Sequence, residues 1–208
     1  MQEKASELIR KWKARNIEGI LCKNRDDVHR ILLDIIPEEA TVGFSGSKTL
    51  DELEIIEMLE TRGNKVFNQY DPSLSREESM RMRRLGAQAD FFLTSANAIA
   101  ETGELVFLSA FGHRIAGIAD APHTIVICGL NKIVPTLEKA IERARNYVTP
   151  LNCKRLKWDT PCFHTGACDN YKCIAPQYKR MCCQLLVVEA EVTEGRLTVL
   201  MVAEDLGF

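Results

Sequence analysis

The residues best suited to chemistry lie near the C-terminus, where five of the eight cysteines fall within residues 160–183. Successive cysteines are separated by five, four and eight residues, and the last two are adjacent. This spacing matches neither a zinc ribbon nor the close cysteine run of a ferredoxin. Four thiolates are still the ligand set that suits zinc or a 4Fe–4S cluster. The candidate metal ligands are Cys162, Cys168, Cys173 and one of the pair Cys182 and Cys183, of which we take Cys182.

Two other uses of these thiols stay open, namely a redox or disulfide pair and unreactive structural thiols. Permanent disulfides are uncommon in a reducing cytosol, so a purely structural staple is the least favoured use. The basic residues Lys172, Lys179 and Arg180 lie among the thiols. We expect them to offset anionic charge and to lower the pKa of the thiols. His164 is an alternative metal ligand, although a solvated loop histidine is the more common case.

A second group of polar residues follows a predicted buried strand. The segment TSANAIAETGEL, residues 94–105, contains Asn97, Glu101 and Gly103. In open α/β sheets, ligands collect at the carboxyl ends of the strands. A carboxylate at Glu101 would act there as a general base or as an acyl-accepting nucleophile, beside a glycine that lets a substrate approach the backbone. The alternative is a turn in which Asn97 and Glu101 cap backbone groups.

A turn rich in glycine and serine, VGFSGSKTL at residues 42–50, joins a predicted strand to a helix. Gly43 and Gly46 let the backbone curl so that the first N–H groups of the helix face an opening. Such a turn can hold a phosphate or a carboxylate, but it is neither a Walker A motif nor a dinucleotide fingerprint. The alternative is a tight turn in which Ser47 or Thr49 caps the helix.

Three further polar residues would complete an anion-binding pocket. Arg114 follows His113 in the segment AFGHRIAG, and Asn131 and Lys132 follow a buried strand in GLNKIVP. Each residue is ordinary when taken alone. Together with Asn97 and the turn at 42–50, they predict a pocket for a small anionic metabolite.

The elements that must position these residues alternate between strands and helices. Strand-like apolar runs occur at residues 17–23, 65–70, 90–100 and 123–130, and helical patterns at 5–15, 25–36, 75–89 and 134–148. A helix after the turn ends at Gly63. This alternation predicts an α/β fold with a mostly parallel sheet flanked by helices.

The second half of the chain departs from simple alternation. Apolar runs on either side of AFGHR, within residues 103–119, predict a hairpin or an antiparallel excursion. Two strand-like runs at 184–192 and 197–207, joined through Gly195, predict a C-terminal β-hairpin after the cysteine loop. Cys22 and Cys128 fall in predicted strands and are assigned to the apolar core, whereas Cys153 is left unassigned.

Composition limits the classes of partner. The 27 basic and 29 acidic residues nearly cancel, and neither sign forms a long block, so we expect no nucleic-acid or membrane partner. The N-terminus has no signal-peptide pattern, which predicts a cytoplasmic protein. A length of 208 residues predicts one domain over 1–208, with a lead-in at 1–39 and a cysteine loop at 160–183. The alternating surface charge permits a homodimer as easily as a monomer.

Several motifs in order resemble the LUD-domain family, which includes lactate-utilisation proteins. They are GFSGSKTL, SANAIAETGEL, FGHRIAG, GLNKIV, ERARNY with the PLN that follows, and TPC with the later G-x-C. The resemblance runs from about residue 40 to the C-terminus. It implies the α/β fold of the superfamily of glucosamine-phosphate isomerases, ribose-phosphate isomerases and CoA-transferases. It also implies a role near the oxidation of L-lactate to pyruvate, beside iron–sulfur oxidoreductase subunits.

The resemblance also bears on single residues. Class I CoA-transferases of this fold use a glutamate followed closely by glycine as acyl acceptor, and Glu101 to Gly103 resembles that arrangement. Residues 43–47 resemble a glycine-rich loop that faces the substrate. Family members usually have Asn at the position of His113, and the better-known lactate-utilisation members lack the cysteine loop. This chain therefore resembles a shorter, cysteine-bearing branch.

The sequence predicts an enzyme or enzyme subunit of lactate or 2-hydroxy-acid utilisation that binds a small anionic substrate, or an acyl or phosphate cofactor, near Glu101. One alternative is a non-catalytic electron-transfer or assembly subunit that works through a metal at the cysteine loop. For the metal at the cysteine loop, the family's association with iron–sulfur proteins favours a 4Fe–4S cluster over zinc. A second alternative is a metabolite-sensing binding protein.

Overall fold

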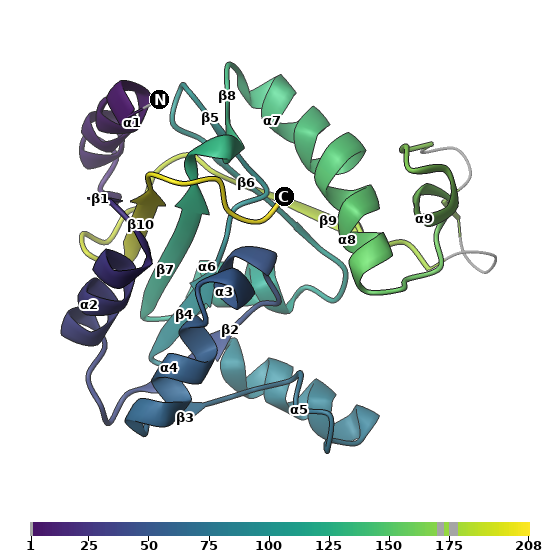
Figure 1. Ribbon diagram of the computed structural model, residues 1–208, viewed down its shortest axis with the longest axis horizontal. Helices are drawn as coiled ribbons and strands as arrows, with labels where there is room; N and C mark the ends of the chain where they lie inside the picture. The colour runs from purple at the N-terminus through teal and green to yellow at the C-terminus, as the bar shows by residue number, and fades with distance from the viewer. Residues whose placement is uncertain (1, 170–172, 175–178) are drawn as a thin grey trace. The chain divides into compact units, whose positions relative to one another are not determined.

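The computed structural model describes residues 2–169, 173–174 and 179–208 (Figure 1). Lys172, which we expected near the thiols, lies outside the described residues. The chain forms two compact units. The first unit consists of Met1–Ser95, His113–Asn131 and Ala190–Gly207, and the second of Ala96–Gly112, Lys132–Glu189 and Phe208. The chain passes back and forth between them, so neither unit is one continuous stretch.

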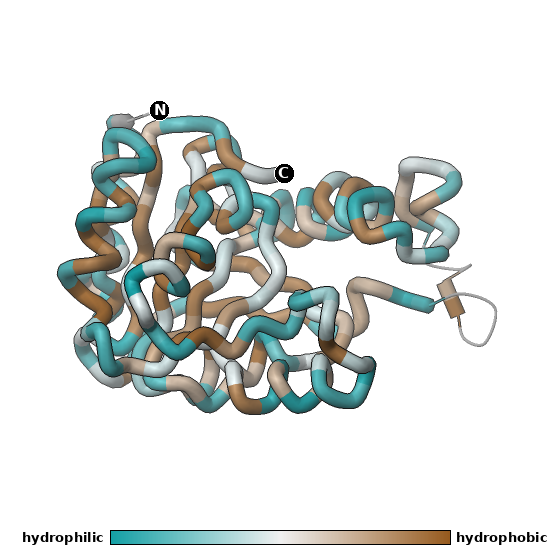
Figure 2. Tube along the Cα trace, turned by 60° about the horizontal axis from the view of Figure 1, so that its bottom comes forward, coloured by the Kyte–Doolittle hydropathy of each residue, from teal (hydrophilic) through white to brown (hydrophobic). Residues whose placement is uncertain are grey.

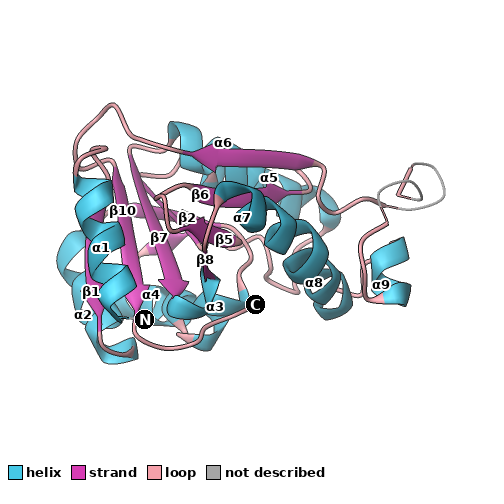
Figure 3. Ribbon diagram, turned by 90° about the horizontal axis from the view of Figure 1, so that it is seen from above, coloured by secondary structure: helices cyan, strands magenta, loops and turns pink. Residues whose placement is uncertain are grey.

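A parallel sheet forms the centre of the first unit. Its spatial order is β1-β10-β7-β4-β2-β3, and every neighbouring pair runs parallel. The strands are β1 (Glu18–Cys22), β2 (Thr41–Phe44), β3 (Lys65–Val66), β4 (Phe91–Thr94), β7 (His123–Gly129) and β10 (Leu197–Val202). Figure 3 shows β7 and β10 running side by side. The predicted α/β fold with a mostly parallel sheet is confirmed, and the sheet is open rather than closed into a barrel.

The strand order reverses at β2. From β2 the chain first adds β3 on one side and later adds β4 on the other side, after which β7 and β10 continue away from it. The carboxyl ends of β2 and β4 therefore flank a topological switch point, where chain connections leave in opposite directions. Open α/β sheets bind their ligands at this place.

Helices cover both faces of the first unit's sheet. They are α1 (Gln2–Lys13), α2 (Arg25–Ile35), α3 (Lys48–Glu52), α4 (Ile55–Arg62), α5 (Arg76–Gly86) and α6 (His113–Asp120). Because side chains alternate along a strand, Val42 and Phe44 point to the face that α2, α3 and α4 cover. Gly43 points to the opposite face, where α5 packs so closely that a Cβ on Gly43 would lie 1.8 Å from the carbonyl oxygen of Gly86.

The core of the first unit is aliphatic. Leu32, Leu59, Leu93 and Ile127 are fully buried in one cluster between the sheet and helices α2 to α4. In Figure 2 the interior strands are brown, whereas the surrounding helices alternate between brown and teal. Burial of each such side chain stabilises the fold by roughly 1.5–3 kcal/mol. This rigid layer holds the ends of β2 and β4 in place.

The second unit has its own small mixed sheet, with the order β8-β5-β6-β9. Its strands are β5 (Ala98–Ala100), β6 (Leu105–Ser109), β8 (Ile133–Val134) and β9 (Gln184–Val188). Helix α7 (Leu137–Arg143), the π-helical η2 (Ala144–Val148) and α8 (Thr149–Arg155) form one continuous helical run (Figure 1). The short α9 (Pro161–Thr165) follows. Small residues on both sides let α7 lie close to the sheet, namely Ala98, Ala100, Ala140 and Ala144.

The predicted C-terminal β-hairpin is wrong. Strand β9 pairs antiparallel with β6 in the second unit, whereas β10 lies between β1 and β7 in the first unit. Every residue of β10 is buried. A strand covered on both faces is typical of the interior of a parallel sheet, and its unbroken apolar run, LTVLMV, carries that signal. This run lacks the alternation of apolar and polar residues that a hairpin strand with one solvated face would show.

Three other predicted elements are also corrected. The strand predicted at 65–70 is two residues long, and the strand predicted at 90–100 is two strands that belong to different sheets. The second apolar run of the 103–119 segment is helix α6, and the antiparallel partner of β6 is β5. The helix end predicted at Gly63 is confirmed, and α5 begins with a capping box formed by Ser75 and Glu78.

No helix of the described residues is long and apolar enough to cross a membrane.

Candidate functional site

Two hydroxyl groups meet at the switch point of the first unit. Ser45 directly follows β2, and Thr94 is the last residue of β4. Their side-chain oxygens are 2.7 Å apart, and both residues are almost completely buried. The backbone N–H of Ser45 also donates to the carbonyl oxygen of Leu93, so the parallel pairing of the two strands continues to this point. The sheet thus fixes two polar side chains where a ligand is expected.

The guanidinium group of Arg114 is held at the same place. Its Nε donates to Ser45 Oγ at 2.9 Å, and its Nη2 donates to the carbonyl oxygen of Gly46 at 2.7 Å. Arg114 lies in the first turn of α6 and is half-buried. The structure therefore brings together Arg114 and the glycine- and serine-rich turn, as predicted for an anion-binding site.

A second pair of hydroxyl groups extends this polar cluster. Ser95 Oγ donates to Thr49 Oγ1 at 3.3 Å and lies 3.7 Å from the sulfur of Cys128. Thr49 is fully buried inside α3. Ser47 occupies the N-cap position of α3, but its side chain makes no capping hydrogen bond there. The alternative in which Ser47 or Thr49 caps the helix is thus met in position, because Ser47 is the N-cap residue, but not by a side-chain hydrogen bond, and Thr49 lies within the helix. We call Ser45, Thr49, Thr94, Ser95 and Arg114 the switch-point cluster.

Packing explains both glycines of the turn. Gly43 has no room for a side chain, because helix α5 crosses directly over it. A Cβ on Gly46 would lie 2.2 Å from the hydroxyl oxygen of Tyr70, which accepts a hydrogen bond from the Gly46 N–H at 3.0 Å. A ligand-binding role for Gly43, Gly46 and Ser47 stays a prediction.

Sequence reasoning gave no role to His113, yet it is an unusual residue in the first unit. Both of its ring nitrogens are buried and have no hydrogen-bond partner among the described residues. Burial and, to a smaller extent, the positive charges of Arg114 and Arg83 together lower the pKa of His113 to about 4. The imidazole is therefore neutral at pH 7 and offers one donor and one acceptor beside Arg114. In the sequence, His113 stood out because it occupies a position at which family members usually have Asn.

The predicted residues of the second unit lie around the turn between β5 and β6. Gly103 has a φ of +114°, and its N–H donates to the carbonyl oxygen of Ala100 at 2.8 Å, which closes the turn. Glu101 is half-buried on this turn. Asn97 Oδ1 accepts a hydrogen bond from the backbone N–H of Leu108 at 2.7 Å. The alternative in which Asn97 caps a backbone group is thus confirmed.

Lys132 and Asn131 have different environments although they are adjacent in sequence. Lys132 belongs to the second unit and is only 4 % exposed. Strands β5 and β8 run parallel to each other. Lys132 immediately precedes β8, whereas Glu101 immediately follows β5, so the two residues lie at opposite ends of this strand pair. Asn131 belongs to the first unit, where its side chain makes hydrogen bonds with both the N–H and the carbonyl oxygen of Leu206. Its amide therefore anchors the C-terminal segment.

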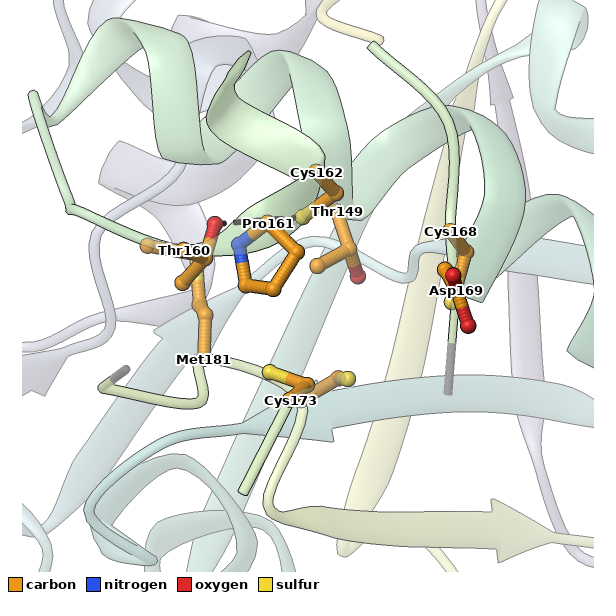
Figure 4. Close-up of a pocket in the computed structure, with 9 residues that line it drawn as sticks. Thr149, Thr160, Pro161, Cys162, Cys168, Asp169, Cys173 and Met181 are labelled. Carbon is orange, nitrogen blue, oxygen red and sulfur yellow. Dashed lines mark hydrogen bonds between the residues drawn. The ribbon is translucent and has the colours of Figure 1, made fainter. Parts of the chain in front are cut away.

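The four predicted cysteine ligands line one small pocket of the second unit. Figure 4 shows Cys162, Cys168 and Cys173 around it, and Cys182 completes the lining. The interior volume is about 10 Å³. Thr149, Thr160 and Met181 form other parts of its wall.

The adjacent Cys182 and Cys183 differ in orientation. Cys182 lines the pocket, whereas Cys183 is exposed and directs its thiol to the carbonyl oxygen of Arg180 at 3.1 Å. Cys153, left unassigned from the sequence, is buried in α8 with its sulfur 3.7 Å from that of Cys162. Cys22 and Cys128 are buried in β1 and β7, as predicted.

Basic residues do not bring the pKa of Cys168 or Cys173 below that of an ordinary thiol. Burial raises the pKa of Cys168 and Cys173, and negative charge on Cys182 raises both further. Burial likewise raises the pKa of Cys153 to about 12. Arg180 acts in the expected direction on Cys168 and Cys173, but its effect is smaller than that of burial.

The thiols as they stand are too far apart to share one metal ion. Within the part of the chain that the structure describes, no three His, Cys, Asp or Glu side chains are placed to hold a metal ion as they stand. His164 is exposed and pairs with Asp159, with Nε2 2.8 Å from Oδ1, so it is solvated as expected, although it lies in α9 rather than in a loop. Metal binding at the four cysteines stays a prediction.

The fold and the switch-point cluster define an open α/β protein with a polar, cationic site at the carboxyl ends of its strands. The LUD domain model matches residues 5–202, so the chain belongs to the LUD domain family. The crystal structure of a DUF162 family protein from Deinococcus radiodurans is similar, with a TM-score of 0.54 and 13 % identity over 98 % of each chain. At this identity the likeness concerns the fold alone. Among curated proteins, none matches the sequence significantly.

Proposed function

We propose that this LUD domain protein serves lactate utilisation by binding a small 2-hydroxy acid at the switch-point cluster of the first unit. The observation that carries the proposal is the guanidinium group of Arg114, which Ser45 and Gly46 hold at the carboxyl end of β2. The family includes lactate-utilisation proteins, and lactate is a small carboxylate with a neighbouring hydroxyl group. The guanidinium group of the cluster can bind the carboxylate of lactate, and the Ser and Thr hydroxyls can bind its hydroxyl group.

The chemistry of recognition follows from the residue types. A guanidinium group binds carboxylates through charge-assisted hydrogen bonds, which are about twice as strong as neutral ones. The neighbouring Ser and Thr hydroxyls both donate and accept, so they suit a ligand hydroxyl group. The neutral imidazole of His113 lies next to Arg114 in sequence and offers a further acceptor. Because the cluster is largely buried, competition from water is reduced and each of these interactions is strengthened.

Isothermal titration calorimetry tests the proposal directly. L-lactate, D-lactate, pyruvate and inorganic phosphate are titrated into the wild-type protein and into Arg114→Gln and Arg114→Lys. Loss of a charged hydrogen-bonding group should weaken lactate binding by about ten- to hundredfold in Arg114→Gln. Arg114→Lys keeps the charge but loses the planar fork, so we expect an intermediate affinity.

A matched control separates binding from folding. Arg62 also lies in the first unit and donates to backbone carbonyls of Leu33 and Ile36. Arg62→Lys should therefore lower the thermal midpoint without changing the affinity for lactate. Equal lactate binding by wild type and Arg114→Gln would remove the proposal, whereas tight binding of phosphate alone would replace the 2-hydroxy acid by a phosphate ligand.

We propose separately that Glu101 is a catalytic carboxylate, acting as a base or as an acyl acceptor. Its place on a tight turn beside Gly103, whose φ is +114°, supports the proposal, because the turn leaves backbone space next to the carboxylate. If Glu101 is an acyl acceptor, transfer of CoA from an acyl-CoA to a free carboxylate should disappear in Glu101→Gln and persist in Glu104→Gln on the same turn. Lactate binding with no such transfer in the wild type would instead identify a metabolite-sensing protein.

A further inference from the structure

We propose that the second unit holds a soft metal centre on the thiolates of Cys162, Cys168, Cys173 and Cys182. The site is separate from the switch-point cluster, and it does not depend on the function proposed there. Its occupant is a zinc ion or an iron–sulfur cluster, the two kinds of centre that four cysteine ligands suit in proteins.

The first argument is the convergence of the four side chains on one pocket. Cys162 lies in α9, Cys168 follows that helix, and Cys182 immediately precedes Cys183 and β9. Cys173 lies between them in the loop. These positions span about a tenth of the chain, yet all four line the same pocket (Figure 4). Exposed Cys183 does not take part, so convergence selects particular cysteines rather than the whole group.

The second argument is the chemistry of the donor set. Thiolates select zinc and iron–sulfur clusters over hard cations, which prefer oxygen ligands. The pocket of about 10 Å³ is close to the size that a single water needs, roughly 10–15 Å³. A space of this size suits a single ion with thiolate ligands, whereas a 4Fe–4S cluster is larger. Cys162 lies in α9, and Cys168 and Cys173 lie outside helices and strands.

The third argument is the positive charge beside the pocket. Four thiolates around a divalent ion leave an excess of negative charge, which favours nearby cations. The Nε of Arg145 is buried without a hydrogen-bond partner among the described residues, and its charge acts on Cys168. Arg180 donates through Nε to the carbonyl oxygen of Cys182 at 3.2 Å. Both guanidinium groups would offset the charge of an occupied centre.

The fourth argument is the rigid frame around Cys162. Thr160 caps α9, because its side chain accepts a hydrogen bond from the N–H of Phe163. Gly166 ends the helix with a φ of +73°, which turns the chain toward Cys168. Cys162 also packs against Cys153 and Met181 in a small buried cluster. The helix and the buried cluster thus fix the position of Cys162 as one ligand.

Metal analysis of the full chain, purified without oxygen, tests the proposal. Zinc and iron are measured by mass spectrometry, acid-labile sulfide is measured chemically, and visible absorbance is recorded. We expect about one zinc per chain and colourless protein, or iron with equal sulfide and a brown colour. Either result supports the centre, and the two results identify its occupant. Absence of zinc and iron, together with no binding of added Zn²⁺, would overturn it.

Cysteine variants decide which thiols bind the metal. Cys168→Ser and Cys173→Ser should each lower bound metal by at least about tenfold, because a thiolate ligand is lost. Cys183→Ser is the matched control and should retain all of the bound metal. Titration with Co²⁺ gives a second readout, since thiolate–cobalt charge-transfer absorbance should weaken in the two ligand variants and not in the control. Equal metal loss in Cys183→Ser and Cys168→Ser would contradict the assigned ligand set.

Discussion

The side-chain oxygen of Ser45 lies 2.7 Å from that of Thr94, although 49 residues separate them in sequence. The contact joins the carboxyl ends of β2 and β4, where the strand order reverses. Arg114 binds the same serine, so a positive charge is added to a pair of buried hydroxyls. This arrangement is the basis for assigning ligand binding to the first unit.

A double-mutant cycle measures the contact between Ser45 and Thr94. Ser45→Ala and Thr94→Val each leave a buried hydroxyl without this partner, which should lower the free energy of unfolding by about 1–3 kcal/mol. The double variant should lose less than the sum of the single losses, by about 0.5–2 kcal/mol. Chemical denaturation of the four proteins checks this. Strict additivity would show that the two hydroxyls do not interact.

Gly43→Ala should prevent normal folding of the first unit. Its added Cβ would lie 1.8 Å from the backbone oxygen of Gly86, and backbone cannot rotate away as a side chain can. Gly195→Ala is the matched control, because nothing lies within 4 Å of its added Cβ. Its positive φ of +78° should cost only about 1 kcal/mol. Thermal unfolding of both variants distinguishes steric overlap from backbone strain, and a Gly43→Ala midpoint above that of Gly195→Ala would contradict the packing.

The buried His113 should make stability depend on pH. Its pKa is about 4 in the folded protein and about 6.5 for an unperturbed histidine, so the unfolded state binds more protons between these values. The free energy of unfolding should therefore be highest above pH 6.5 and fall by about 3 kcal/mol as the pH decreases to 4. His113→Asn should flatten this interval, whereas His164→Asn, at an exposed histidine, should leave it unchanged. Urea denaturation at half-unit pH steps provides the curve.

Carboxylate groups change the free energy of unfolding in a more acidic range of pH. Hydrogen bonds from Thr41 lower the pKa of Asp90, and Arg196 lowers the pKa of Glu191. Their stabilisation is present above the usual carboxylate pKa and is lost as the pH falls through the lowered values. A decline between pH 6.5 and 4.5 that His113→Asn does not reduce would contradict the assignment to His113.

The cysteines should differ in their rates of alkylation. Cys183 is exposed, whereas Cys22 is fully buried and burial raises its pKa to about 11. Because the thiolate is the reactive form, metal-free native protein should be labelled by N-ethylmaleimide at Cys183 well before Cys22. Peptide mass spectrometry over a time course checks the order. Labelling of both at equal rates would show that β1 is not stably packed.

The sequence predicted the alternating α/β architecture because buried strands and amphipathic helices have distinct periods. It could not predict which strands pair. The runs that become β9 and β10 are close in sequence and apolar, so a hairpin was the simplest local solution. Long-range packing instead places β10 in the interior of the parallel sheet, where every one of its residues is buried.

The candidate site was predicted in part for a similar reason. Arg114 and the turn at Gly46 were expected together, and a hydrogen bond from Arg114 Nη2 to the carbonyl oxygen of Gly46 joins them. Thr94 and His113 were missed, because an isolated threonine or histidine has no characteristic pattern until the fold buries it. The four cysteines were identified from their chemistry alone, but only the structure distinguishes Cys182 from Cys183.

The central claim is that Arg114 contacts a bound 2-hydroxy acid, and side-chain NMR of ¹⁵N-arginine-labelled protein tests it most directly. Addition of L-lactate should shift the Nε–H signal of Arg114, assigned through Arg114→Lys, in a saturable way. The Nε–H signal of Arg62 should stay in place over the same titration. Saturable binding of lactate with no change at Arg114, or no binding of lactate at millimolar concentration, would contradict the account.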